Sequence, residues 1–222
     1  MNKKRIVGIL GTSANPLHEG HIAMAEAALR TLPLDEVVLM VTPHNPVKDL
    51  SGYASIEHRM HLAHLTALTS KHFGTSLKVS EFEVLLKRFG DKNDTATLLR
   101  HYSDMYQALQ PVWMMGADNL STLHEWGHWT DIMEQYPVVI FGRSVSNDAA
   151  LNSIAARQYA STQKSASEFR CEVGTWCLLS HATHPASSTE IRTRILEGEY
   201  PQYIPKGAVD YIREFKLFGC TA

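Results

Sequence analysis

Two histidines near the N-terminus have the spacing and setting to bind phosphate groups. His18 and His21 end the segment 11–21, which follows the short apolar run 5–10 and precedes the alanine-rich run 22–29. The first run is typical of a buried strand and the second of a helix, so the segment between them is predicted to connect the two. A helix N-terminus offers backbone N–H groups to an anion, and imidazoles beside it add further donors. The pattern indicates a site for a phosphate-bearing ligand.

A plainer interpretation of the same segment stays open. Gly11 and Gly20 allow the backbone to turn sharply or to lie close to a ligand, because neither residue has a Cβ. A cluster of Gly, Asn and Pro between a strand and a helix is, however, often no more than a turn, and two nearby histidines can be incidental. Spacing alone does not decide between the two interpretations.

The identity of the residues favours the phosphate site. Segment 11–21 resembles the first signature of the nucleotidyltransferases with an (H/T)xGH motif, most closely that of the nicotinate-mononucleotide adenylyltransferases. Ala14 stands where an aromatic residue is usual, and Thr12 stands where a glycine is usual. Both histidines and the Asn-Pro pair keep their register, so the resemblance covers the residues that would do chemistry.

This resemblance implies roles for five residues. His18 and His21 would contact the phosphates of ATP as catalytic residues, with His21 the more important in the transition state. Gly11, Ser13 and Gly20 would bind ATP.

A second motif lies near the C-terminus at 186–192, Ala-Ser-Ser-Thr-Glu-Ile-Arg. Ser187 and Glu190 have the spacing of a capping box, an ordinary way to begin a helix. The string also resembles the ISSTxIR motif of the same family, with Ala186 in place of the first isoleucine. An arginine fork can hold phosphate oxygens at two points. The resemblance implies ATP-phosphate contacts from Ser188 and Thr189 and from a catalytic Arg192.

A third stretch, 114–126, resembles the family pattern GxDxL followed by a tryptophan. It implies that Asp118 binds ATP through the ribose hydroxyls. Trp126 would stack on the pyridine ring of a mononucleotide, although packing in the core is an equally good interpretation of a tryptophan.

Two weaker matches concern the mononucleotide. In the loop predicted for 43–49, Asn45 and Lys48 resemble the family segment that closes on this substrate, with an exposed loop lysine as the alternative. Thr97 lies where the family has a Tyr-Thr-x-x-Thr turn that recognises the nicotinate carboxylate, but only part of that turn is present at 93–97.

Histidine patterns elsewhere favour no metal site. His124, Glu125 and His128 form an HExxH string, which on a helix would bind zinc. Gly127 weakens a helix there, and no consistent third ligand follows. The three-residue steps between His58, His61 and His64 spread these side chains over a helix face, which indicates a solvated or interface stripe.

The composition excludes other classes. The 222 residues carry a formal net charge of −2, which gives no basic field for nucleic acid. No apolar run approaches the ~18 residues of a membrane-spanning helix. The three cysteines form no Cys-x-x-Cys pair, which is typical of a reducing compartment. We expect a cytoplasmic protein that binds neither nucleic acid nor membrane, with a homo-oligomer left open.

Apolar runs alternate with helical stretches along the chain. Strands are expected at 5–10, 36–42, 76–80, 111–115, 137–141 and 176–179, and helices at 22–29, 56–68, 94–109, 187–196 and 205–215. The alternation predicts an α/β fold: a single domain, 1–222, with a Rossmann-like, doubly wound parallel sheet, C-terminal helices and ligands at the carboxyl ends of the strands. The polar segment 142–170 is expected to form an exposed excursion or lid. The resemblance implies the nucleotidyltransferase version of this fold.

The implied reaction transfers the adenylyl group of ATP, carried with Mg²⁺, to nicotinate mononucleotide, giving deamido-NAD and pyrophosphate. One alternative is a related transferase acting on nicotinamide mononucleotide, phosphopantetheine or a cytidylyl substrate; Trp126 and the 45–48 loop favour a pyridine mononucleotide. Another is a nucleotide-binding protein without catalysis, which the intact His18, His21 and Arg192 argue against. The third is a zinc hydrolase based on the HExxH string.

Overall fold

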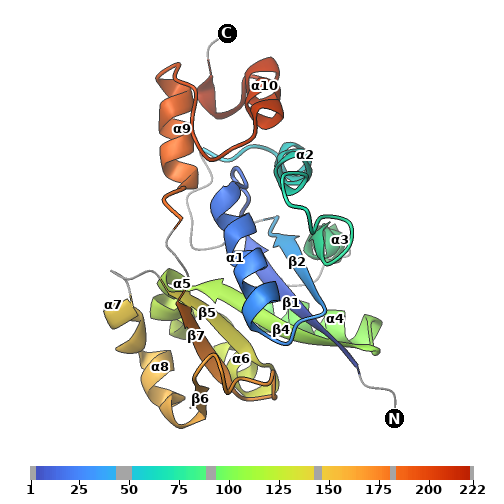
Figure 1. Ribbon diagram of the computed structural model, residues 1–222, viewed down its shortest axis with the longest axis vertical. Helices are drawn as coiled ribbons and strands as arrows, with labels where there is room; N and C mark the ends of the chain where they lie inside the picture. The colour runs from blue at the N-terminus through green and yellow to red at the C-terminus, as the bar shows by residue number, and fades with distance from the viewer. Residues whose placement is uncertain (1–3, 44–51, 89–93, 143–146, 181–183, 221–222) are drawn as a thin grey trace.

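The strands of the protein form one parallel sheet. The computed structural model describes residues 4–43, 52–88, 94–142, 147–180 and 184–220. Within these ranges seven strands lie in the order β3-β2-β1-β4-β5-β7-β6, and every neighbouring pair is parallel (Figure 1). The order reverses between β1 and β4, which are neighbours at the centre of the sheet. The predicted α/β, doubly wound class is confirmed.

The strands are β1 (Arg5–Thr12), β2 (Glu36–Val41), β3 (Leu77–Ser80), β4 (Leu109–Gly116), β5 (Val138–Gly142), β6 (Gln163–Lys164) and β7 (Trp176–Ser180). The α-helices are α1 (Glu19–Thr31), α2 (Ile56–Ala67), α3 (Phe82–Arg88), α4 (Thr95–Met105), α5 (Ala117–Thr122), α6 (Trp129–Gln135), α7 (Asn147–Leu151), α8 (Ile154–Gln158), α9 (Ser188–Leu196) and α10 (Lys206–Glu214). Short 3₁₀ helices lie at Leu123–Glu125, Ala160–Thr162 and Leu217–Gly219.

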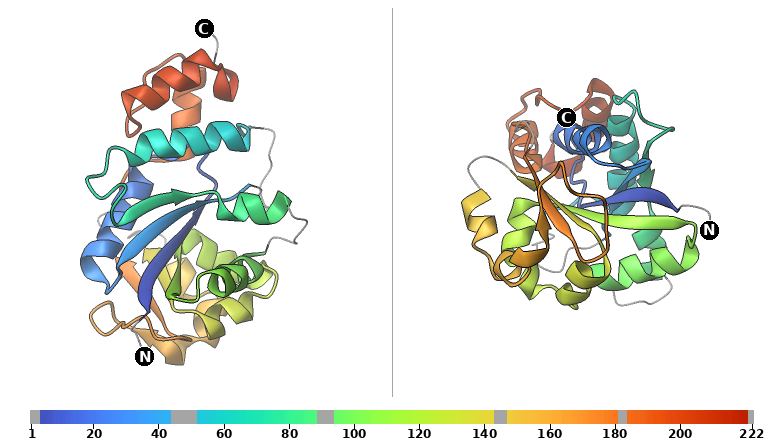
Figure 2. Two further views of the ribbon diagram at one scale, coloured as in Figure 1. Left: turned by 90° about the vertical axis from the view of Figure 1, so that its right-hand side faces the viewer. Right: turned by 60° about the horizontal axis from the view of Figure 1, so that its bottom comes forward.

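Helices cover both faces of the sheet, which explains why the central strands are continuously apolar. Alternate residues of β1 point to opposite faces: Val7 and Ile9 join the cluster under α4, α5 and α6, whereas Ile6 and Leu10 join the cluster under α1 and α2. The right-hand view of Figure 2 shows α1 and α4 on opposite sides of the sheet. A third cluster joins α9 and α10 to Leu62 of α2, which fixes the C-terminal helices beside the sheet.

The expected helix over 94–109 is wrong at its C-terminal end. Helix α4 ends at Met105, and Leu109 already begins β4, where it pairs with Arg5. Tyr106 and Leu109 continue the helical spacing of apolar residues, but from Leu109 onward the chain pairs with β1 in the sheet, so the helix ends before that residue. The short helices α3, α5 and α6 were not predicted, because helices of six or seven residues show too few turns for periodicity to be read.

The polar segment expected to form an exposed excursion is packed on one side. Ala150, Ala155 and Phe169 are fully buried, whereas Ile154 is 49% exposed. Trp176 of β7 donates its indole N–H to the carbonyl of Tyr159, which ties the segment to the sheet. The segment contributes α7, α8 and the edge strand β6, while most of its polar side chains are exposed.

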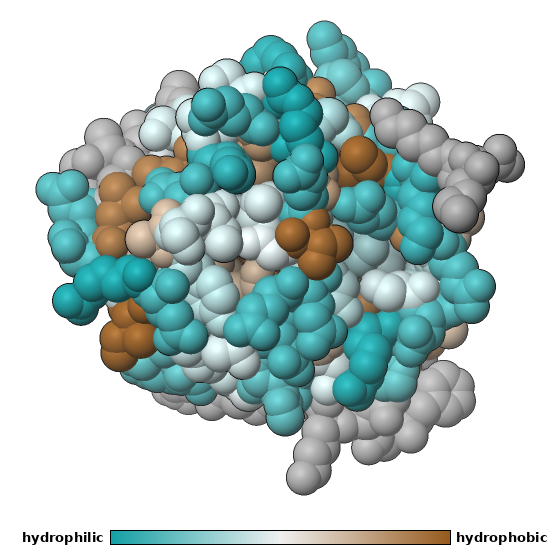
Figure 3. All heavy atoms as spheres, turned by 90° about the horizontal axis from the view of Figure 1, so that it is seen from below, coloured by the Kyte–Doolittle hydropathy of each residue, from teal (hydrophilic) through white to brown (hydrophobic). Residues whose placement is uncertain are grey.

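None of the helices described is both long and apolar enough to cross a bilayer. The face at the end away from α10 is largely hydrophilic, with hydrophobic residues in separate spots (Figure 3).

Gly11, near the end of β1, allows β1 and β4 to pack at the reversal point of the sheet. A Cβ at this position would lie 2.4 Å from the Cη2 atom of Trp113 and 3.0 Å from its Cζ2 atom. The indole is rigid and 4% exposed, so it has little room to move. The absence of a side chain at position 11 is therefore a packing requirement.

We predict that Gly11→Ala lowers the free energy of unfolding by about 1–3 kcal/mol, the usual range for overpacking a close-packed core. Urea denaturation followed by circular dichroism measures this. Gly207→Ala is the matched control, since no atom lies within 4 Å of its Cβ position, in α10. It should change stability by less than about 1 kcal/mol, in the stabilising direction. Equal stability of the two variants would contradict the packing role of Gly11.

Candidate active site

The two sequence motifs meet at one turn, although the contacting residues Pro16 and Ser188 lie 172 positions apart in the chain. Ser188 Oγ donates to the carbonyl of Pro16 at 3.0 Å, and Arg192 Nη1 donates to the carbonyl of Asn15 at 2.8 Å. The turn follows β1 and contains a cis Asn15–Pro16 peptide bond. The N-termini of α1 and α9 are thus held beside the same turn.

His18 is the N-cap of α1, so the helix begins inside the first motif and not after it. Its Nδ1 accepts the backbone N–H of Gly20 at 3.1 Å, and His21 Nδ1 accepts the backbone N–H of His18 at 3.4 Å. These two bonds form a capping box made of histidines. The two ring centroids are 4.1 Å apart.

The hydrogen bonds of the capping box assign the tautomer of each histidine. A ring nitrogen that accepts a backbone N–H carries no proton, so the neutral imidazoles of His18 and His21 carry their proton on Nε2. Both rings therefore carry an N–H group on Nε2, and a phosphate oxygen accepts hydrogen bonds from such groups. His21 Nε2 lies 3.0 Å from the hydroxyl oxygen of Thr12, which also accepts the N–H of Ala14.

The N-terminus of α9 is built differently. Ser187 is the N-cap but makes no side-chain cap hydrogen bond, so the capping box considered for Ser187 and Glu190 is not formed. Glu190 pairs with Arg194 instead, at 3.2 Å. The Ser187 side chain therefore does not occupy the first N–H groups of α9, and a helix N-terminus with such groups can bind an anion.

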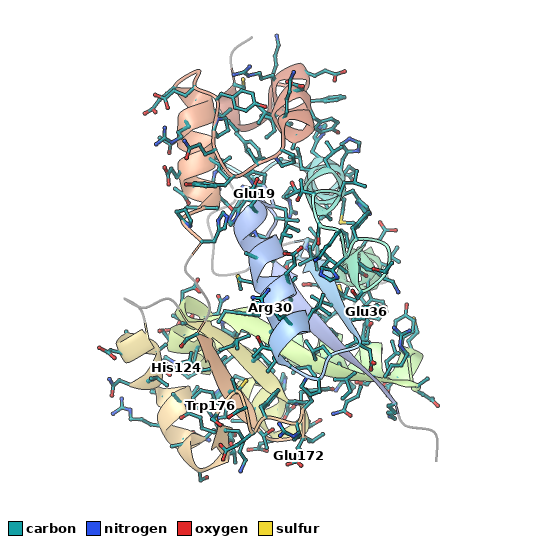
Figure 4. The ribbon with its side chains drawn as sticks, in the orientation of Figure 1. Glu19, Arg30, Glu36, His124, Glu172 and Trp176 are labelled. Atoms are coloured by element: carbon teal, nitrogen blue, oxygen red, sulfur yellow. The ribbon has the colours of Figure 1, made fainter. Side chains whose placement is uncertain are left out.

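A histidine that the sequence reading did not single out lies between the two helices. His184 Nδ1 accepts the backbone N–H of Ala186, and its Nε2 is 3.7 Å from the carboxylate of Glu19. Figure 4 shows Glu19 at the α9 end of α1 and Arg30 at the other end of that helix. The pair adds a contact between the two motifs.

Small residues allow this close approach. A Cβ on Gly20 would lie 2.9 Å from Cε1 and Nδ1 of His18 and 3.5 Å from the Cβ of Ala186. Gly20 is thus required by the position of the His18 ring. Ala186, the departure from the family motif, is buried against this region.

Asp118 lies at the carboxyl end of β4, next to the turn that follows β1. It is exposed, in the first turn of α5, and its carboxylate folds back over Gly116. A Cβ on Gly116 would lie 2.3 Å from Asp118 Oδ1. The carboxylate is therefore held at the sheet edge where β1 and β4 end.

Two of the residues expected to bind the mononucleotide are brought to one place. Asp94 caps α4 by accepting the N–H of Thr97 at 2.7 Å. A Cβ on Gly127, next to Trp126, would lie 3.4 Å from the Cβ of Asp94. Trp126 is half-buried against the core cluster, which leaves part of its surface exposed. Asn45 and Lys48 lie outside the described residues.

The HExxH string is not helical in the way a zinc site requires. His124 and Glu125 lie in a 3₁₀ turn, Trp126 is extended, and His128 has a positive φ of 54°. Among the described ranges, no group of three or more His, Cys, Asp or Glu side chains is placed to hold a metal ion. The geometry argues against the zinc hydrolase.

The site also contains a residue that sequence reasoning missed, Arg59 of α2. It donates to the carbonyl of Ser13, one of the residues expected to bind ATP, at 2.7 Å. Its signal in the sequence is spacing: Arg59, Leu62, Ala63 and Thr66 share one face of α2, and all four are buried. An arginine on the apolar stripe of a helix indicates a buried polar contact.

Comparison with known proteins agrees with this geometry. A family model described as cytidylyltransferase-like matches residues 9–194. A relative from Ruegeria sp. (strain TM1040), named "Probable nicotinate-nucleotide adenylyltransferase", is 36% identical over 192 residues, which cover 85% of this chain and 96% of the relative. A relative of the same name from Caulobacter sp. (strain K31) is 35% identical over 196 residues, covering 86% and 99%.

A solved structure shows the same fold. The Plasmodium falciparum nicotinic acid mononucleotide adenylyltransferase complexed with NaAD superposes with a TM-score of 0.75 at 14% identity, over 98% of both chains. The predicted nucleotidyltransferase version of the α/β fold is thereby confirmed. The match to the family model and the identity with these relatives establish that the chain belongs to the cytidylyltransferase-like family, among the nicotinate-nucleotide adenylyltransferases.

Proposed function

We propose that this protein transfers the adenylyl group of ATP to nicotinate mononucleotide, giving deamido-NAD and pyrophosphate. The observation that carries the proposal is the meeting of both motifs at the Asn15–Pro16 turn, where Ser188 and Arg192 bind the carbonyls of the segment that ends in His18 and His21. The Ruegeria and Caulobacter relatives, 36% and 35% identical over the aligned residues, both carry the name of this activity.

The chemistry requires alignment more than acid–base catalysis. An oxygen of the mononucleotide phosphate forms a bond to the α-phosphorus of ATP, and the bond from that phosphorus to the β-phosphate bridging oxygen breaks. The attacking phosphate is already anionic near neutral pH, so no strong base is needed. Catalysis then consists of positioning the two substrates and stabilising the negative charge that develops on the departing pyrophosphate.

The histidines supply donors for that charge. In this proposal His18 and His21 point their Nε2–H groups at the phosphate oxygens of ATP, and the Nε2–H group of His21 is shared between the phosphate and the Thr12 hydroxyl oxygen 3.0 Å away. The N-terminus of α1 adds backbone N–H groups. The capping box fixes both rings before the substrate arrives, which reduces the reorganisation needed at the moment of reaction. Gly11, Ser13 and Gly20 allow the triphosphate to approach the turn.

The C-terminal motif supplies the arginine. Arg192 uses one N–H for the carbonyl of Asn15 and another for the hydroxyl of Thr189 at 3.4 Å. A guanidinium has five N–H donors, so others remain for phosphate oxygens. In the proposal Arg192, Ser188 and Thr189 hold the β- and γ-phosphates together with the N-terminus of α9.

The remaining predicted residues hold the nucleosides. Asp118 accepts hydrogen bonds from ribose hydroxyls, and Trp126 stacks on the pyridine ring with its exposed surface. The backbone N–H of Thr97 is already bound by Asp94, so Thr97 would contact the mononucleotide through its side chain. Asn45 and Lys48 stay in the proposal as contacts to the mononucleotide phosphate.

Mg²⁺ fits this site as an ion bound to ATP. The donor set around the turn consists of imidazole and guanidinium N–H groups, hydroxyls and helix N-termini, which bind anions and not a hard cation. Phosphate oxygens and water would therefore be its ligands. Bound with ATP, Mg²⁺ would supply positive charge beside the phosphate oxygens.

Pyrophosphate release from ATP and Mg²⁺ tests the proposal, with nicotinate and nicotinamide mononucleotides as separate acceptors. We expect release with the acid form well above that with the amide. Equal use of both would identify an enzyme of dual specificity. If folded protein releases pyrophosphate with neither acceptor, a pyridine mononucleotide is refuted as the substrate. Phosphopantetheine would then be tested as the acceptor.

We predict that His21→Ala lowers kcat by about 10²–10³-fold, the usual cost of removing one donor to the charge of a transition state. The circular dichroism spectrum should not change. His64→Ala is the matched control, because His64 is an exposed histidine on α2, outside the site. Near-normal turnover of His21→Ala would remove His21 from the mechanism.

We also predict that Gly20→Ala lowers kcat by about 10–100-fold, because the new methyl group displaces the His18 ring and misplaced groups are costly at this scale. Gly207→Ala, in open space, should leave kcat unchanged. Steady-state kinetics on both variants makes the comparison. An unaffected Gly20→Ala enzyme would show that the His18 ring position is not needed.

A further inference from the structure

Arg59 is a buried cation whose hydrogen bonds go to backbone carbonyls. It is 3% exposed and lies on α2, facing the carboxyl ends of β1 and β2. Nη1 donates to the carbonyls of Ser13 and Thr42, both at 2.7 Å, and Nη2 donates to that of Pro43 at 2.8 Å. Nε donates to the carbonyl of Ala54 at 3.1 Å. Four of its five N–H groups therefore bind carbonyl oxygens.

These four carbonyls belong to three different parts of the chain. Ser13 is in residues 13–17, between the end of β1 and His18, which are called the phosphate turn below because they precede the two histidines proposed to bind ATP. Thr42 and Pro43 follow β2, and Ala54 precedes α2. Residues 44–51, which include the expected mononucleotide contacts Asn45 and Lys48, lie between Pro43 and Ala54 in the sequence. Arg59 thus holds the chain before and after this segment, and holds the phosphate turn with the same guanidinium.

Other contacts tie the same two regions together. Asn15 Nδ2 donates to the carbonyl of Gly52 and Asn15 Oδ1 accepts the N–H of Ala54, both at 3.1 Å. Tyr53 Oη donates to Ser13 Oγ at 3.3 Å, and its ring lies 5.6 Å from the guanidinium carbon of Arg59. The phosphate turn and residues 52–54 are therefore joined at several points, with Arg59 at the centre.

The contacts of Arg59 are costly to arrange, which argues against an incidental role. Burial lowers the pKa of the Arg59 guanidinium, and Tyr53, Glu57 and Glu83 act in the opposite direction. A charged group inside a protein requires hydrogen-bond partners for its donors, and removing it leaves the partner carbonyls unsatisfied. A lysine could occupy the space, but one ammonium has three donors without the planar fork.

We propose that Arg59 is a positioning residue that sets the place of the mononucleotide relative to the phosphate turn that holds ATP. The inference rests on the proposed function. Arg59 touches neither substrate; it acts through the chain on either side of residues 44–51 and through Ser13. Its contribution is the alignment of the attacking phosphate oxygen with the α-phosphorus, to which rates are sensitive at the scale of an ångström.

The test uses Arg59→Lys and Arg59→Met in the full chain, with kcat and both KM values measured and ATP affinity determined by calorimetry without the mononucleotide. We expect the mononucleotide KM to rise and kcat to fall, each by about tenfold or more. The Kd of ATP should stay within about twofold, because Ser188 and Arg192 still hold the turn after β1 and the phosphate contacts proposed for His18, His21 and Arg192 are unchanged.

Trp176→Phe is the control for lost stability. Trp176 is a fully buried residue of β7, well separated from the N-terminal end of α1 and from Glu19 (Figure 4). This variant should lower the melting temperature and leave both KM values unchanged. If Arg59→Met does not fold, Arg59→Lys decides the question by the same split between KM and Kd.

Two results would overturn the inference. One is an Arg59→Lys enzyme with unchanged mononucleotide KM, whether or not kcat falls, because a merely structural role lowers the active fraction alone. The other is a parallel loss of ATP affinity, which would place Arg59 in the ATP site itself. An inactive wild-type enzyme with nicotinate mononucleotide would instead refute the proposed function, so the two failures are distinguishable.

Discussion

The carbonyl groups of the turn after β1 are the constraint on which the site depends. Ser13, Asn15 and Pro16 lie beyond the last sheet hydrogen bond of β1 and before α1, so neither element supplies donors to their oxygens. The protein meets this need from two helices that lie far apart in the sequence: α2 provides Arg59, and α9 provides Ser188 and Arg192. Satisfying these buried carbonyls fixes α9 beside α1, and that places two helix N-termini on one side of the turn. The same hydrogen bonds that complete the fold therefore also assemble the proposed phosphate site.

The two arginines perform similar local tasks with different consequences. Arg59 is buried and uses four of its five N–H groups on carbonyls, so it has little left with which to bind a ligand. Arg192 is half-buried and uses two, so it can hold the turn and a phosphate at once. Both residues are arginines, so residue type does not distinguish the positioning role proposed for Arg59 from the phosphate-binding role proposed for Arg192. The distinction rests on how exposed each guanidinium is and on how many of its N–H donors are not bound to carbonyls or hydroxyls.

The departures from the family motifs are accommodated by local packing. Ala14 has a positive φ of 48° and is buried in the cluster beneath α1, where a small side chain fits. Thr12 accepts the N–H of Ala14 and contacts His21 Nε2, so the hydroxyl stabilises the turn and holds the second histidine. Ala186 lies against Gly20, which lets the two motifs approach closely. These substitutions keep the positions of the histidines while changing what surrounds them.

The sequence by itself determined the parallel α/β fold and the positions of the two motifs, because continuous apolar strands and residue-specific signatures are local properties of the chain. It could not decide whether Ser187 caps α9, where α4 ends, or how far the polar segment 142–170 is packed, since each depends on partners distant in the sequence. Arg59 shows the limit most clearly. An arginine on the apolar face of a predicted helix indicates a buried polar contact but not its partners, and its role follows only from which carbonyls the tertiary structure leaves without other donors.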